Sequence, residues 1–185
     1  MKQIITLLLV FMSFNLAYSQ NAQLNTQIEV GGLRGIQLSK TFPILKSGAL
    51  AEISVTKSLG DYVQLGVGAA YLQLESEEFI PLFLQCRAHK KSQSNSPYFT
   101  TSIGYAKARN SDFENAIYTN YVGKVYFSPG IGYYYQINEK WGLSAGLSYI
   151  MQKVDLEHLN TDGQIYHTES LTLDLISFKV GISFH

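Results

Sequence analysis

The chain has 185 residues, with 14 basic and 14 acidic side chains, so its formal net charge at neutral pH is zero. This balance gives no electrostatic reason to bind nucleic acid, and the length fits one domain. The only cysteine, Cys86, excludes an internal disulfide framework and a thiolate metal site.

The N-terminus has the pattern of a secretory signal. Lys2 provides a positive charge, residues 4–16 form a short apolar run, and Ala17 and Ser19 are the small residues that signal peptidase requires. The run is too short for a transmembrane anchor. We therefore expect a cleaved signal peptide over residues 1–19 and export of a single domain over residues 20–185.

The rest of the chain is a series of segments in which apolar and polar residues alternate. A period of two places alternate side chains on opposite faces of a strand, and no segment of similar length has a helical period. The cleanest segment is the last, where Ile176, Phe178 and Val180 alternate with Ser177 and Lys179. The predicted strands cover residues 25–33, 49–58, 62–74, 80–89, 98–108, 124–136, 141–152 and 176–185.

These segments predict an all-β fold, an eight-stranded antiparallel up-and-down transmembrane β-barrel. After the signal the chain has no apolar run of helical-span length, and only a closed barrel otherwise satisfies every backbone group in lipid. The links 58–61, 90–96 and 138–140 are short, whereas 34–48, 109–123 and 153–170 are longer. Membrane barrels have short periplasmic turns and long outer loops. The link 75–78 is the exception, because it should be external but is short.

Two irregularities are expected within the strands. Pro129 has no N–H to donate and predicts a bulge or local distortion. Leu171, Leu173 and Leu175 have the opposite parity to Ile176 and the residues after it, which predicts a bulge near Leu175 or a strand that has left the membrane. Residues 160–163 are a turn signal, so the flanking stretches can extend the last two strands into a hairpin above the membrane, whose exposed edge could pair with another chain.

Aromatic residues lie near the predicted strand ends, where Tyr and Trp favour the lipid headgroup region. We expect an aromatic belt at the periplasmic end. Its members are Tyr62, Tyr98, Phe99, Tyr135, Trp141 and Phe184.

Four charged residues fall on the predicted inward face, namely Glu29, Glu52, Arg87 and Lys179. The interior of an eight-stranded barrel is just wide enough to be filled by side chains, and charges buried there need partners. We expect an interior polar network that plugs the barrel. The alternative is that these charges face solvent in loops or at rims.

Catalytic and metal sites find little support. His158, His167, Glu169 and Ser170 are close in sequence in the last outer link, but no nucleophile motif frames them. The four histidines are far apart in sequence and lack the spacing of metal ligands. We expect no catalytic residues, no metal and no cofactor.

Several motifs resemble those of the small outer-membrane β-barrel family (OmpA/OmpX-like, the "porin family" or "outer membrane protein beta-barrel domain" group). They are residues 79–82 (FIPL), 96–99 (SPYF) leading to Gly104–Tyr105, 127–132 (FSPGIG) and the aromatic C-terminal strand. The family's insertion signal usually ends on an aromatic residue, whereas here Phe184 is penultimate. The resemblance implies a Gram-negative outer membrane, contact with its lipid, and recognition of the C-terminal strand by the barrel assembly machinery.

The expected role is non-enzymatic, structural or in surface interaction at the cell envelope, with a surface partner that the sequence does not identify. One alternative is a soluble secreted or periplasmic barrel that binds a small apolar ligand. It requires an apolar set to turn inward: Val63, Leu65, Val67, Ile176, Phe178, Val180 and Ile182. The second alternative is a lipid-modifying outer-membrane enzyme that uses the last outer link.

Overall fold

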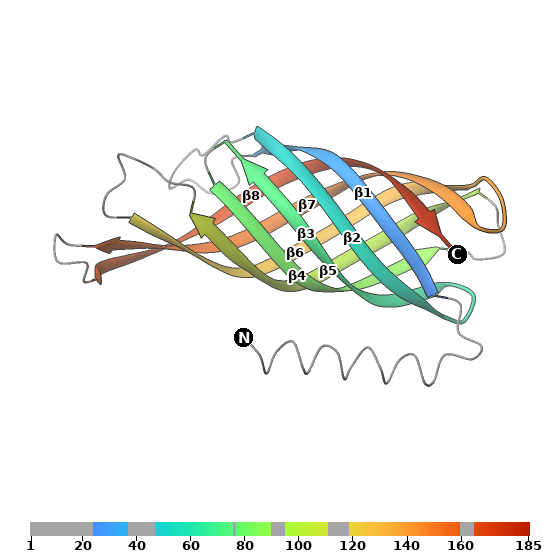
Figure 1. Cartoon of the computed structure of the whole chain (residues 1–185), viewed down its shortest axis with the longest axis horizontal. Coiled ribbons are helices and arrows are strands. Elements are labelled where there is room, and N and C mark those ends of the chain that lie inside the picture. Colours follow the sequence, from blue (N-terminus) through green and yellow to red (C-terminus); the bar gives the residue numbers. More distant parts are fainter. Residues whose placement is uncertain (1–23, 37–46, 76, 90–94, 111–118, 160–164) are drawn as a thin grey trace.

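The computed structural model describes residues 24–36, 47–75, 77–89, 95–110, 119–159 and 165–185, and the expected signal peptide lies outside them. Eight antiparallel strands follow one another around a closed barrel, and β1 pairs with β8 to close it (Figure 1). Within these ranges no helix is long and apolar enough to cross a membrane. The strands are β1 (Leu24–Gly35), β2 (Ser47–Leu59), β3 (Val63–Leu74), β4 (Glu77–His89), β5 (Asn95–Asn110), β6 (Thr119–Gln136), β7 (Trp141–Leu159) and β8 (Ile165–Phe184).

All eight predicted strands are present, in the predicted order. We call the end of the barrel that holds Leu24 and Phe184 the terminal end. The tight β2–β3 turn lies at this end, and its Gly60 has a φ of 80°, a conformation that side chains disfavour. The β6–β7 turn lies there too, where the side chain of Asn138 accepts hydrogen bonds from the backbone N–H groups of Lys140 and Trp141.

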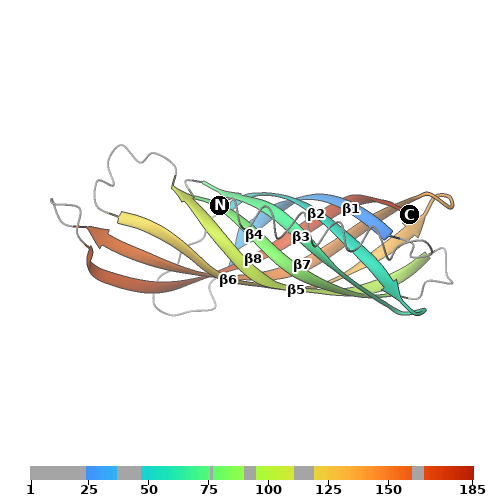
Figure 2. The same ribbon diagram turned by 60° about the horizontal axis from the view of Figure 1, so that its bottom comes forward.

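At the opposite end three strands continue beyond the others. Residues 119–123, 154–159 and 165–171 of β6, β7 and β8 stay paired there, and we call this three-stranded sheet the extension (Figures 1 and 2). The pairing of β8 with β1 ends at Leu175, opposite Gly35. The predicted hairpin above the barrel is therefore confirmed, and both of its strands are longer than the alternation alone indicated.

The outer face of the barrel is apolar. Leu82, Leu84 and Ile131 are 61–64% exposed although each is strongly hydrophobic. The residues that a soluble barrel would turn inward also point outward, with Phe178 at 56% and Val67 at 52% exposed. A face of this kind is stable against acyl chains and costly against water.

The lumen has two layers of different polarity. Near the terminal end it is lined by polar and charged side chains, whereas towards the extension it is filled by a hydrophobic cluster, which we call the apolar layer. The members of the apolar layer are Leu33, Leu50, Ala70, Leu72, Leu74, Phe79, Phe83, Ala106, Tyr126, Ile150, Val154, Leu173 and Leu175.

This layering explains why the expected bulge near Leu175 is absent. The β7–β8 register runs unbroken through Leu175, and Leu173, Leu175, Ser177 and Lys179 all point inward. The apolar residues shift from even to odd positions there because the lumen itself becomes apolar. The odd positions of β8 point inward on both sides of this change. In β7–β8 the register shift lies between His158 and Leu159 instead.

Pro129 also leaves the register unchanged. It pairs with Thr101 of β5, and the β6–β7 register is the same on both sides of it. The irregularity in β6 lies between Gly123 and Tyr126, at the base of the extension. The bulge predicted at Pro129 is therefore absent, because the missing N–H removes one donor without inserting a residue. The other expectation, a local distortion, is present, since the β6–β7 pairing skips Ser128 and Pro129.

Candidate functional site

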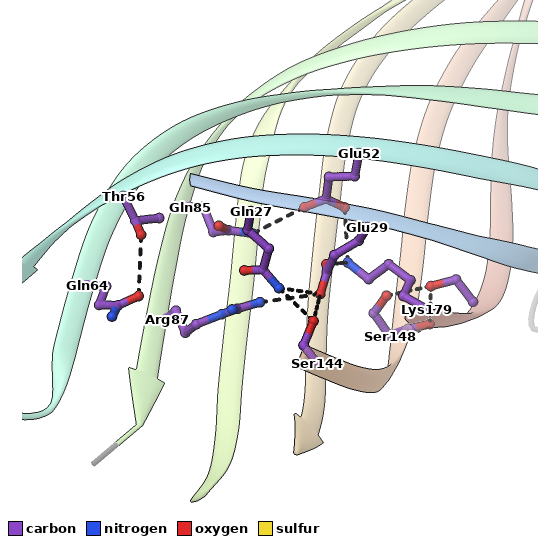
Figure 3. Close-up of polar contacts among 11 residues, drawn as sticks. Gln27, Glu29, Glu52, Thr56, Gln64, Gln85, Arg87, Ser144, Ser148 and Lys179 are labelled. Atoms are coloured by element: carbon purple, nitrogen blue, oxygen red, sulfur yellow. Dashed lines mark hydrogen bonds and ion pairs between the residues drawn. The ribbon is translucent and has the colours of Figure 1, made fainter. Parts of the chain in front are cut away.

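The four predicted interior charges meet in the polar layer of the lumen. Glu29 comes from β1, Glu52 from β2, Arg87 from β4 and Lys179 from β8, and each is at most 5% exposed. Figure 3 shows the four side chains converging across the lumen. The alternative location, in loops or rims facing solvent, is wrong for all four.

Ion pairs connect the two acids to the two bases. The ammonium of Lys179 lies 3.1 Å from Glu29 Oε2 and 3.0 Å from Glu52 Oε2. One terminal nitrogen of Arg87 lies 3.6 Å from Glu29 Oε1. The group is formally neutral, with two carboxylates and two cations, which is the condition for burying charges at acceptable cost.

Uncharged polar residues complete the network. The amide of Gln27 donates to Glu29 Oε1 at 2.6 Å, and the hydroxyl of Ser144 donates to the same oxygen at 3.0 Å. The amide of Gln85 donates to Glu52 Oε1 at 3.2 Å (Figure 3). Their inward parity in the alternation was the available signal for these partners, which sequence reasoning did not single out.

Strand register and small residues make room for the network. Glu29 and Glu52 are directly opposite each other in β1 and β2, and Gly181 lies opposite Glu29 in β8. A Cβ on Gly181 would come within 2.5 Å of both Glu29 Cγ and the carbonyl oxygen of Ile28. Glycine at this position therefore allows the Glu29 side chain to cross the neighbouring strand.

Tyr98 belongs to the lumen and not to the aromatic belt. It is 4% exposed, and the guanidinium of Arg87 lies 4.3 Å above the centre of its ring. Within the described residues Arg87 Nε has no hydrogen-bond partner, so the ring supplies a cation–π contact instead. The prediction failed because it used nearness to the strand end, whereas Tyr98 has the inward parity of Thr100 and Ser102.

The other five belt residues are at least partly exposed near the terminal end. Tyr62 is 61% exposed, Tyr135 52%, Phe99 51% and Trp141 42%. Phe184 is half-buried because its ring packs against Trp141, with ring centroids 4.3 Å apart.

A second polar cluster closes the lumen at the terminal end. The ring of the last residue, His185, shares hydrogen bonds with the Tyr134 hydroxyl and, at 2.8 Å, with Asn25 Oδ1. The His89 ring also lies beside the Tyr134 ring, with centroids 5.7 Å apart, and His89 contacts Gln64 at 2.8 Å. The cavity left between these side chains, about 10 Å³, has room for about one water molecule.

The apolar layer fills the lumen above the network. Leu72, Leu74, Phe79 and Ile150 are 0% exposed and Tyr126 is 1% exposed. Side chains in this state have no water beside them, so the arrangement is a packed core and offers no aqueous path.

The residues considered for catalysis lie on β7 and β8 of the extension. Ser170 donates a 2.6 Å hydrogen bond to Asp155, whereas His158 and His167 face each other on the opposite side of the sheet. The geometry therefore brings neither imidazole to the Ser170 hydroxyl. The two histidine rings stack with centroids 5.6 Å apart.

Asp155 also forms an ion pair with Lys124 of β6. The Lys124 ammonium and, secondly, the Ser170 hydroxyl hold the pKa of Asp155 below its usual value, because both donate to the ionised carboxylate. This cluster connects β6, β7 and β8 at the base of the extension.

The fold and lumen define a class of protein: a closed eight-stranded barrel with an apolar outer face and a side-chain-filled interior, the architecture of small outer-membrane barrels. No family model matches the sequence, and no curated protein matches it.

Solved structures of small outer-membrane barrels share the fold. Neisserial surface protein A (NspA) aligns with a TM-score of 0.61 at 10% identity, over 89% of this chain and 99% of NspA. OprG from Pseudomonas aeruginosa aligns with a TM-score of 0.53 at 12% identity, over 88% and 96%. The N-terminal β-barrel domain of P. aeruginosa OprF aligns with a TM-score of 0.50 at 17% identity, over 89% and 100%. The predicted fold is thereby confirmed, and the resemblance to small outer-membrane barrels holds at the level of the fold.

Proposed function

We propose that this chain is an integral outer-membrane barrel with a closed lumen and a non-enzymatic role, structural or in surface interaction, that displays the extension on the cell surface. One observation carries the proposal: the distribution of polar and apolar side chains is the inverse of that in a soluble protein. Val67, Leu84 and Phe178 point outward, while Glu29 and Lys179 are buried in the lumen.

The closed lumen favours a role as a membrane anchor over a role as a channel for solutes. Three successive layers fill it: the His185 cluster, the ion-paired network and the apolar layer. A solute would have to break ion pairs and displace buried leucines to cross. The extension, in contrast, is the part that lies in water and is accessible to other molecules.

The proposed orientation follows from the distribution of the links. The terminal end, with its tight turns, would lie in the periplasm, and the extension would lie outside the cell. Outer-membrane lipid would surround the apolar face. The barrel assembly machinery would read the C-terminal strand, β8, which completes the barrel by pairing with β1.

Cell fractionation combined with gel mobility tests the location. The protein is expected in the outer-membrane fraction, with a band that shifts on boiling in SDS because the folded barrel resists the detergent. A soluble periplasmic protein without such a shift would contradict the proposal.

Planar-bilayer recording tests the closed lumen. Wild-type barrel should give no steady conductance, because three layers of side chains fill the lumen. Stable channels in the wild type would contradict the anchor role while leaving the membrane location intact.

A further inference from the structure

The extension makes direct neighbours of two histidines that lie on either side of the link between β7 and β8. His158 of β7 and His167 of β8 are direct partners in the antiparallel register. Their side chains therefore leave the sheet on the same face, from positions whose Cβ atoms are about 5 Å apart. Their rings stack with centroids 5.6 Å apart and an interplanar angle of 25°.

We propose that His158 and His167 form a chelating site for a divalent transition cation such as Cu²⁺ or Zn²⁺. Imidazole nitrogen is a preferred ligand of these ions. With metal–nitrogen bonds of about 2.1 Å, two imidazoles on one tetrahedral ion have ring centroids roughly 5 Å apart. The observed separation is near this value, and rotation of the two stacked rings out of their near-parallel arrangement would aim one nitrogen of each at a common ion.

The site is accessible and locally shaped. His167 is exposed and His158 half-buried, so a hydrated ion reaches both from solvent. The register shift beside the pair places one extra residue in β8, since His158 pairs with His167 but Leu159 pairs with Ile165, and such irregularities re-aim side chains near functional sites. Glu169 shares the face of His167 two residues along β8, and its carboxylate adds negative potential beside the ion.

Two protein ligands make this an open site. Among the described residues no group of three or more His, Cys, Asp or Glu side chains is placed to hold a metal. Water would complete the coordination, which distinguishes an exchangeable surface site from a structural one. The extension would then carry a cation-capture function on the outer side of the membrane, beyond the anchor role proposed above.

Copper titration tests the site directly. The full protein, purified without a polyhistidine tag and folded in detergent micelles, is titrated with Cu²⁺ by calorimetry, and the complex is examined by electron paramagnetic resonance. We expect one Cu²⁺ per barrel, with hyperfine structure from two imidazole nitrogens. Loss of a residue that only hydrogen-bonds to a metal ligand lowers metal affinity about 10-fold or more. Loss of a ligand itself should cost no less, so His158→Asn and His167→Asn should each weaken Cu²⁺ binding at least about 10-fold.

Thr168→Ala is the matched control, because Thr168 neighbours His167 but points to the opposite face. It should bind Cu²⁺ like the wild type. Heat-modifiability of each variant shows that the barrel is folded. No binding to the wild type, unchanged binding in either His variant, or a one-nitrogen signal would each overturn the proposal.

Discussion

Removal of the Lys179 ammonium is the sharpest perturbation of the lumen. Lys179 is 4% exposed and its ammonium is shared by Glu29 at 3.1 Å and Glu52 at 3.0 Å. Lys179→Met keeps the length of the side chain but leaves two carboxylates facing one guanidinium. Breaking a buried pair by removing one partner costs about 3–5 kcal/mol, so the free energy of unfolding should fall by that amount.

Urea titration of the barrel in detergent micelles, followed by tryptophan fluorescence of Trp141, measures this loss. Lys57→Met is the matched control, because Lys57 is exposed on β2 and its removal should change stability by less than about 0.5 kcal/mol. The double variant Lys179→Met/Glu52→Gln restores neutrality and should recover part of the loss. If Lys179→Met were no less stable than Lys57→Met, the network would not hold the barrel together.

Three further predictions concern other parts of the molecule. Gly181→Val should destabilise the barrel by about 1–3 kcal/mol in the same titration, because its Cβ would meet Glu29, whereas Gly32→Val has open space and should be nearly neutral. Leu72→Ala should cost about 2–5 kcal/mol, since Leu72 is 0% exposed, and equal stability to wild type would contradict a packed apolar layer. Asp155 has a lowered pKa, so its contribution to the extension is present at neutral pH and is lost as pH falls through that lowered value. Amide exchange in residues 154–158, corrected for the intrinsic rate, should lose protection on acidification in wild type, and Asp155→Asn should abolish this pH dependence.

The strand pattern was predictable because lipid imposes a simple rule on the outer face. Every outward residue in the band must be apolar, so Ile176, Phe178 and Val180 reveal the strand and its facing without any tertiary information. The same parity placed Glu29 and Lys179 inside. The pairing of the four charges, which come from four strands, was predictable because an unpaired buried charge is costly.

The lumen-facing errors share one physical cause. Lumen-facing side chains can be polar or apolar as long as they fill the space. Leu173 and Leu175 therefore point inward without a bulge. Tyr98 is inward because it has the parity of Thr100 and Ser102, and its ring then fills the space beside Arg87. The His158–His167 pair depends on the register of a hairpin outside the membrane, where alternation carries no lipid signal.

The central claim is that the outer face meets lipid while the lumen is closed, and spin-label accessibility along β8 tests it most directly. Single cysteines at positions 175–178, 180 and 182, which spare Lys179 and Gly181, are introduced in a Cys86→Ser background reconstituted in lipid vesicles, labelled, and exposed to oxygen or to a polar nickel complex. We expect even positions to be accessible to oxygen and odd positions to be accessible to neither reagent. Odd positions accessible to the nickel complex would show a water-filled lumen, and even positions accessible to it would show an outer face in water; either result would contradict the account.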